Sequence, residues 1–146
     1  NSYAAVRAIP GEGLEIPIYL LGSSTFSAQL AGAKGLPYAF ASHFAPTHLY
    51  EALRLYHQNF EPSLQCKAPY TIACVNVIAA ETDEKARYLE TSLQQLALGI
   101  RETLKAQLTD FIEATRVNEI MAVSHIFDHQ DRLKSYEILS SLLSGE

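Results

Sequence analysis

Short apolar runs alternate with segments of helical spacing along most of the chain. The apolar runs predict strands at residues 16–21, 38–41, 70–79 and 119–126. The helical spacing predicts helices at residues 24–34, 46–60 and 132–143, and another beginning at residue 83. The run at residues 16–21 is continuously apolar, so we expect a strand buried on both faces. The succession of strand and helix predicts βα units around a parallel sheet.

One segment departs from this regular pattern. Residues 83–115 read as a single long helix interrupted only by Gly99. Helices in globular proteins average about 11–12 residues, so one helix of this length is improbable. We therefore expect two helices whose linker is absent from the sequence, with the seam near Arg101 and Glu102.

Composition indicates a soluble globular chain of one domain. The 146 residues are 48% hydrophobic and 18% charged, and the net charge is −5 without a cluster of Lys or Arg. We therefore expect neither a nucleic-acid groove nor a membrane surface as partner. Cys66 and Cys74 have no metal or redox spacing, and Cys74 is expected to be a reduced, buried thiol in a cytoplasmic protein. Because the chain starts at Asn1, we expect a fragment.

The turn after the first predicted strand has the features of an anion site. Gly22, Ser23 and Ser24 lie between a strand end and a helix start, where ligands bind in parallel α/β folds. Glycine lets backbone approach a ligand, and free helix amides together with the hydroxyls of Ser24 and Ser27 suit a phosphate monoester. The alternative is an ordinary helix N-cap, in which the Ser24 side chain bonds the amide of Ser27.

The second predicted strand also ends on residues that could take part in ligand binding or catalysis. His43 could bind a ligand or transfer protons near neutral pH, and Ser42 and Phe44 flank it. A loop histidine bonded to backbone is the alternative. His125 and His129 are four residues apart, but a strand end and loop would not place them as a helix does, so we expect no metal.

Other motifs are absent or have a structural reading. The sequence contains no Gly-x-Ser-x-Gly elbow, P-loop or dinucleotide fingerprint. Asp128 and Arg132 are expected to form a salt bridge or cap between the last loop and the last helix.

The string "LLGSSTFSAQLAGAKGLPYAFASHFAP" resembles the bacterial luciferase-like flavin monooxygenase family. The strings "AIPGEG", "PYTIACVNVIAAETDEKA" and "NEIMAVSHIFDHQDRLKSYEIL" resemble later blocks of its uncharacterised FMN-dependent oxidoreductase subgroup, in the same order. The resemblance implies a (β/α)8 TIM barrel, with residues 1–146 as its C-terminal half, strands five to eight. It also implies an additional segment between Arg101 and Glu102.

The resemblance implies roles for particular residues. Gly22, Ser23, Ser24 and Ser27 would hold the FMN phosphate, although luciferases carry an acidic residue where this chain has Ser23, so only its backbone contact transfers. Ser42, His43 and Phe44 would lie on the flavin-ring or substrate side, with His43 as the catalytic candidate. The phosphate-binding arginines of strand four would lie outside this sequence.

The implied chemistry is monooxygenation of a small organic substrate through a C4a-(hydro)peroxyflavin. Reduced FMN would come from a separate NAD(P)H:flavin reductase and react with O2, in a cytoplasmic homo-oligomer. Tyr38, Phe40 and Phe44 suit either a dry pocket or barrel core. The alternatives are hydride transfer with the deazaflavin cofactor F420, a non-catalytic flavin-binding protein, and another phosphate-binding barrel enzyme such as an isomerase.

Overall fold

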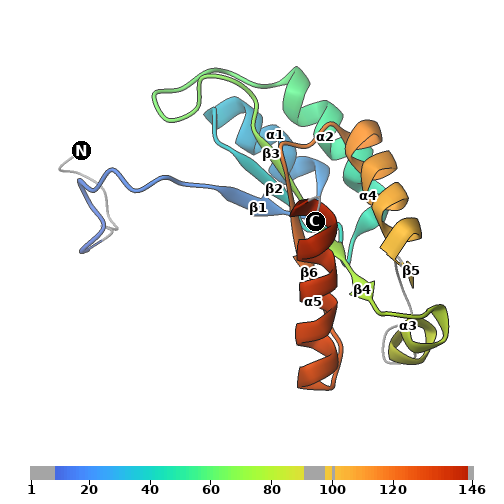
Figure 1. Ribbon diagram of the computed structural model, residues 1–146. Helices are drawn as coiled ribbons and strands as arrows, with labels where there is room; N and C mark the ends of the chain where they lie inside the picture. Colours follow the sequence, from blue (N-terminus) through green and yellow to red (C-terminus); the bar gives the residue numbers. More distant parts are fainter. Residues whose placement is uncertain (1–8, 91–97, 100, 145–146) are drawn as a thin grey trace.

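The computed structural model describes residues 9–90, 98–99 and 101–144. Its centre is a four-stranded sheet in the order β1 (Leu20–Gly22), β2 (Tyr38–Phe40), β3 (Thr71–Asn76) and β6 (Glu119–Val123). Each neighbouring pair is parallel, which confirms the predicted sheet. Figure 1 shows α1, α2 and α4 along one side of this sheet, with α5 passing beside β6.

The helices lie between or after the strands as the pattern predicts. Helix α1 spans Thr25–Lys34, and α2 spans Leu49–Gln58 after the 3₁₀ turn η1 at Pro46–His48. Helix α4 spans Arg101–Thr115, and α5 spans His129–Ser144. None of the described helices is long and apolar enough to span a membrane.

The segment that reads as one long helix is divided. Helix α3 covers Asp83–Glu90, and a short strand β5 (Leu98–Gly99) comes before α4. Strand β5 pairs with β4 (Ile78–Ala79) in a separate two-stranded sheet. The expectation of two helices is therefore confirmed, while residues 91–97 and 100, close to the predicted seam, lie outside the described residues.

The first strand is shorter and more exposed than predicted. Ile18 and Leu21 are 59% and 69% exposed, so the expectation of a strand buried on both faces is wrong. Among the described residues β1 pairs only with β2, which leaves its other edge uncovered. The side-chain amide of Gln65 replaces a strand neighbour at Ile18, accepting from its N–H at 3.1 Å and donating to its C=O at 2.6 Å.

The main core lies between the sheet and helices α1 and α2. Tyr38 and Phe40 of β2 are fully buried there, and the Tyr38 ring stacks on Tyr56 of α2 at 5.5 Å between centroids. The interpretation of Tyr38 and Phe40 as core is therefore confirmed. In α2 the helical spacing identified the side that is buried; its buried residues are Leu49, Ala52, Leu53 and Tyr56.

The opposite face of the sheet carries apolar side chains of its own. Side chains alternate along a strand, so Leu21 and Met121 lie on the side away from the cores that contain Leu20 and Ile120. Leu21 is 69% exposed and Met121 is 54% exposed. Cys74, on this face, is a free and buried cysteine as expected, and burial raises the pKa of its thiol.

Candidate functional site

The carboxyl ends of the four strands meet at one edge of the sheet, because the strands are parallel. The amide of Ala41 donates to Gly22 O at 2.9 Å and links the ends of β1 and β2. Val77 N donates to Val123 O at 2.8 Å and links the ends of β3 and β6. The residues singled out at the ends of the first, second and fourth strands therefore belong to one edge, as ligand-binding residues do in parallel α/β folds.

Ser24 is the N-cap of α1. Its backbone is extended, with φ −136° and ψ 160°, and its Oγ accepts from the amide of Ser27 at 3.3 Å. In return the Ser24 amide donates to Ser27 Oγ at 3.4 Å, which completes a capping box. The ordinary N-cap interpretation of this turn is therefore confirmed, and any ligand would bind a turn that is already capped.

Gly22 is required by the packing of α1 on β1. A Cβ at this position would lie 2.1 Å from Ser27 Oγ and 2.3 Å from Ser27 Cβ. The space beside Gly22 is filled by Ser27, whereas the sequence suggested that the glycine admits a ligand. The role of Gly22 that the structure shows is therefore to let the first turn of α1 close against the strand end.

Ser27 and Ser24 differ in how far their hydroxyls are committed. Ser27 Oγ donates to Ser24 O at 2.7 Å and lies 3.0 Å from the Tyr38 hydroxyl, which itself donates to Ser24 O at 3.2 Å. Burial raises the pKa of Tyr38, opposed by its hydrogen bond with Ser27. Among the described residues, Ser24 Oγ donates only to Ser27 Oγ, at 3.3 Å. Ser27 is half-buried inside this network, whereas Ser24 is exposed at the edge.

The first turn of α1 fits an anion. It carries no acidic side chain, and its leading amides lack partners within the helix. Those amides and the exposed Ser24 hydroxyl form a donor set that suits phosphate, favoured by the helix dipole. Ser23 lies in the same turn and is half-buried.

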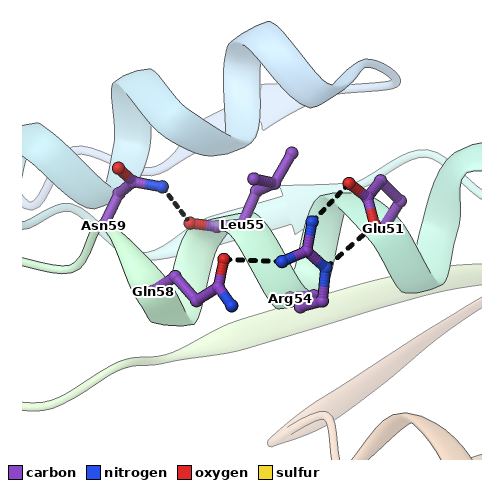
Figure 2. A network of polar contacts seen from close by, with 5 residues as sticks. All are labelled: Glu51, Arg54, Leu55, Gln58 and Asn59. Atoms are coloured by element: carbon purple, nitrogen blue, oxygen red, sulfur yellow. Dashed lines mark hydrogen bonds and ion pairs between the residues drawn. The ribbon is translucent and has the colours of Figure 1, made fainter.

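Arg54 is not available as a cationic partner for this turn. Figure 2 shows its guanidinium on the exposed face of α2, between Glu51 and Gln58. Its Nε donates to Glu51 at 2.9 Å and its Nη1 donates to Gln58 at 2.7 Å. The same pairing raises the pKa of Arg54 and lowers that of Glu51. The guanidinium of Arg54 is therefore engaged by residues of its own helix, which it helps to stabilise.

The three candidates after β2 have different environments. Ser42 is buried, and its Oγ donates to Cys74 O at 2.6 Å, which ties the β2 end to β3. Phe44 is 64% exposed and meets the His43 ring edge-on at 4.6 Å. His43 is half-buried, and its buried Nδ1 has no hydrogen-bond partner among the residues that the structure describes.

Asn76 is a site residue that the sequence reading missed. It ends β3, its Nδ2 donates to His43 O at 2.6 Å, and its Oδ1 is buried without a partner. A polar side chain closing an otherwise apolar strand was the signal that could have revealed it. Ser124, after β6, also has a buried Oγ without a partner, while its amide donates to the Tyr136 hydroxyl at 3.0 Å.

The β6–α5 loop is organised as a helix cap. Asp128 Oδ1 accepts from the amide of Asp131 at 2.9 Å, and this bond lowers the pKa of Asp128. Arg132 donates to Ile126 O at 2.9 Å, and its other terminal nitrogen lies 3.0 Å from His129 Nδ1. The predicted cap is confirmed for Asp128. Within the described ranges, no group of three His, Cys, Asp or Glu residues is arranged to hold a metal ion.

A hollow of about 400 Å³ lies between α3 and this loop. The Lys85–Asp131 ion pair, 2.8 Å between Nζ and Oδ2, stands in its wall. The lining also includes the largely exposed rings of Tyr88 and Phe127. Because α3 and the loop follow the ends of β4 and β6, the hollow adjoins the same side of the sheet as the strand-end residues.

A parallel sheet built from βα units, with polar residues gathered at its carboxyl edge, defines a parallel α/β protein. Among curated proteins, the uncharacterised protein YvbT of Bacillus subtilis is 40% identical over 175 residues, covering 94% of this chain and 52% of the relative. A luciferase-like monooxygenase of Escherichia coli is 39% identical over 171 residues, covering 91% and 51%. The chain belongs to the luciferase-like monooxygenase family.

The chain spans about half the length of these curated relatives. The aligned regions, 175 and 171 residues, are longer than the 146 residues of the chain. The relatives therefore carry residues inside the aligned region that have no counterpart here. This supports the expectation of an absent segment, whose position near Arg101 stays a prediction. No protein-family model matches the chain.

Solved structures show the same fold. The crystal structure of apo-MsnO8 matches with a TM-score of 0.84 at 26% identity, over 99% of this chain and 55% of that one. The oxygenating constituent of 3,6-diketocamphane monooxygenase from Pseudomonas putida, in complex with FMN, matches with a TM-score of 0.68 at 14% identity, over 87% and 48%. The fold is the luciferase-like (β/α)8 type, represented here by the four neighbouring parallel strands β1, β2, β3 and β6.

Proposed function

We propose that residues 1–146 form strands five to eight, the C-terminal half, of a barrel that acts as a flavin-dependent monooxygenase. FMN is the proposed cofactor, supplied in reduced form by an NAD(P)H:flavin reductase. The proposed substrates are O2 and a small organic molecule. The family membership and the FMN-containing neighbour support this proposal.

The observation that carries the proposal is the turn before α1. An exposed Ser24 hydroxyl, helix amides and a first turn without acidic residues stand together at the carboxyl edge of the sheet. In the proposal these groups bind the phosphate of FMN, and Gly22 and Ser27 hold the turn in place. Ser23 contributes its backbone only.

The residues that follow β2 have the other roles in the proposal, in proton transfer, exclusion of water and support of the loop. Reduced FMN and O2 supply the oxygenation chemistry when bound. His43 stands near the reacting groups as the proposed proton-transfer residue, and the exposed Phe44 ring beside it excludes water. Ser42 acts indirectly, because its hydroxyl holds the β2 end on Cys74 O.

The phosphate assignment is tested by Ser24→Ala combined with Ser27→Ala in the complete protein. Loss of the Ser24 hydroxyl donor, and of the Ser27 hydroxyl that holds the turn in place, should weaken FMN binding by roughly 1–3 kcal/mol, measured by fluorescence titration. The same change removes the capping box and should lower the unfolding free energy by about 1 kcal/mol.

Tyr38→Phe is the matched control for this loss of stability. It removes the hydroxyl that contacts Ser27 Oγ and Ser24 O, yet it leaves both serines in place. Stability should fall by about 1 kcal/mol while FMN affinity stays unchanged. If the serine variant binds FMN as tightly as the wild type, the phosphate assignment fails.

A further inference from the structure

One hydrogen bond joins Asn76 to His43, and each of the two side chains also has a buried polar atom without a hydrogen-bond partner among the described residues. The carboxamide of Asn76 donates through Nδ2 to His43 O at 2.6 Å. A carbonyl oxygen can only accept, so this contact fixes which end of the carboxamide is nitrogen. Asn76 Oδ1 must therefore point away from that carbonyl, and there it is buried without a donor.

The second unmatched atom belongs to His43 itself. His43 Nδ1 is also buried and without a partner. A ring nitrogen can donate or accept according to tautomer, whereas a carboxamide oxygen accepts only. Among these two atoms, only a donation from Nδ1–H to Asn76 Oδ1 satisfies both, and buried polar groups strongly favour such pairing.

We propose that Asn76 is a positioning residue that holds His43 as its Nδ1–H tautomer. The structure shows these two atoms apart, and pairing them requires a shift of the loop after β2, whose backbone the Asn76 carboxamide already binds. The His43 ring then presents an unprotonated Nε2, which accepts a hydrogen bond from a hydroxyl or amine of a bound molecule. The use of that nitrogen in oxygenation rests on the proposed function, whereas the tautomer does not.

The ring nitrogens of His43 report the tautomer directly. The complete protein, ¹⁵N-labelled at histidine and free of flavin, is examined by NMR at a pH at which the His43 signals show no imidazolium form. The His43 signals are assigned with His43→Gln. Wild-type protein should show Nδ1 protonated and Nε2 unprotonated, the reverse of the tautomer that a free histidine side chain prefers.

Asn76→Leu removes the acceptor and should convert His43 to a population in which Nε2–H predominates. Asn76→Gln keeps both a carboxamide donor and an acceptor oxygen, and should retain the Nδ1–H form. His57 on α2, packed against the Tyr56 ring, should keep its signals in both variants and serves as an internal control. A wild-type ring with Nε2–H, or a ring unchanged by Asn76→Leu, would overturn the proposal. If Asn76→Leu does not fold, the wild-type spectrum and Asn76→Gln decide.

FMN titration of the same proteins separates this proposal from the proposed function. Absence of FMN binding by the wild type, together with an Nδ1–H ring, would refute the flavin assignment and leave the positioning role intact. FMN binding together with an Nε2–H ring would refute the positioning role of Asn76 and leave the flavin assignment intact.

Discussion

At the scale of single residues, the turn before α1 depends on the fit between Gly22 and Ser27. The sequence marked both residues, because Gly-Ser-Ser after an apolar run is typical of a strand-to-helix turn. It could not show that Ser27 fills the space beside Gly22, since that contact depends on how the helix packs against the strand. Asn76 was missed for the same reason: its environment arises from a loop more than thirty residues away in sequence.

Gly22→Ala should destabilise the complete protein by roughly 1–3 kcal/mol through overpacking, measured by urea unfolding. Adding Ser27→Ala should not restore stability, because the Ser27 Cβ itself lies 2.3 Å from the new Cβ position. Adding Ser27→Gly should relieve the clash. An undisturbed Gly22→Ala protein would contradict this packing.

At the scale of elements, helices were predicted better than strands. The spacing of α2 and the Gly35 cap of α1, with φ 59°, were both readable from sequence. The first strand was not, because an apolar run does not reveal whether a partner strand covers its edge. Ile18 is thus held by the Gln65 side chain, which no local pattern predicts.

The cap of α5 gives a prediction about pH. Because the bond from the Asp131 amide lowers the pKa of Asp128 below its usual 3.8, its stabilising contribution is complete above that value. It is lost as the pH falls through the lowered pKa. Asp128→Asn, which keeps an acceptor but cannot ionise, should therefore lose less stability than the wild type on acidification.

Urea unfolding midpoints at neutral and acidic pH test this point. Glu15→Gln, at an exposed position in the segment before β1, is a carboxylate control far from α5 in sequence. It should follow the wild-type pH profile. If the unfolding midpoints of wild type and Asp128→Asn fall equally on acidification, the ionised Asp128 cap does not contribute the stability proposed for it.

At the scale of the whole molecule, one face of the sheet is exposed at β1 and β6 within the part of the chain that the structure describes, whereas Ile72 and Cys74 of β3 on that face are buried. Leu21 and Met121 expose most of their apolar surface on that face, and β1 has an uncovered edge. In the proposed barrel, the other four strands cover this face and close the edge. The parallel α/β class could be predicted from the alternation of strands and helices, whereas that alternation does not show whether or how the sheet closes.

Residues 1–146 expressed alone should therefore not give a cooperative, monomeric unfolding transition. Analytical ultracentrifugation combined with thermal melting provides the measurement, and association or a broad transition is the expected result. A monomer with a sharp, reversible melt would contradict the half-barrel interpretation.

The nature of the cofactor belongs to the same scale. The absorption spectrum of the purified complete protein distinguishes FMN from the deazaflavin alternative. Reductase-coupled O2 consumption that depends on an organic substrate separates an oxygenase from a non-catalytic flavin-binding protein. We expect an FMN spectrum and substrate-dependent O2 uptake.

The most direct test is a crystal structure of the complete protein soaked with FMN. The account predicts the phosphate at the N-terminus of α1, within hydrogen-bonding distance of the Ser24 hydroxyl and the amides of the first helical turn. A phosphate bound at the opposite edge of the sheet, or a soaked crystal without FMN, would contradict it.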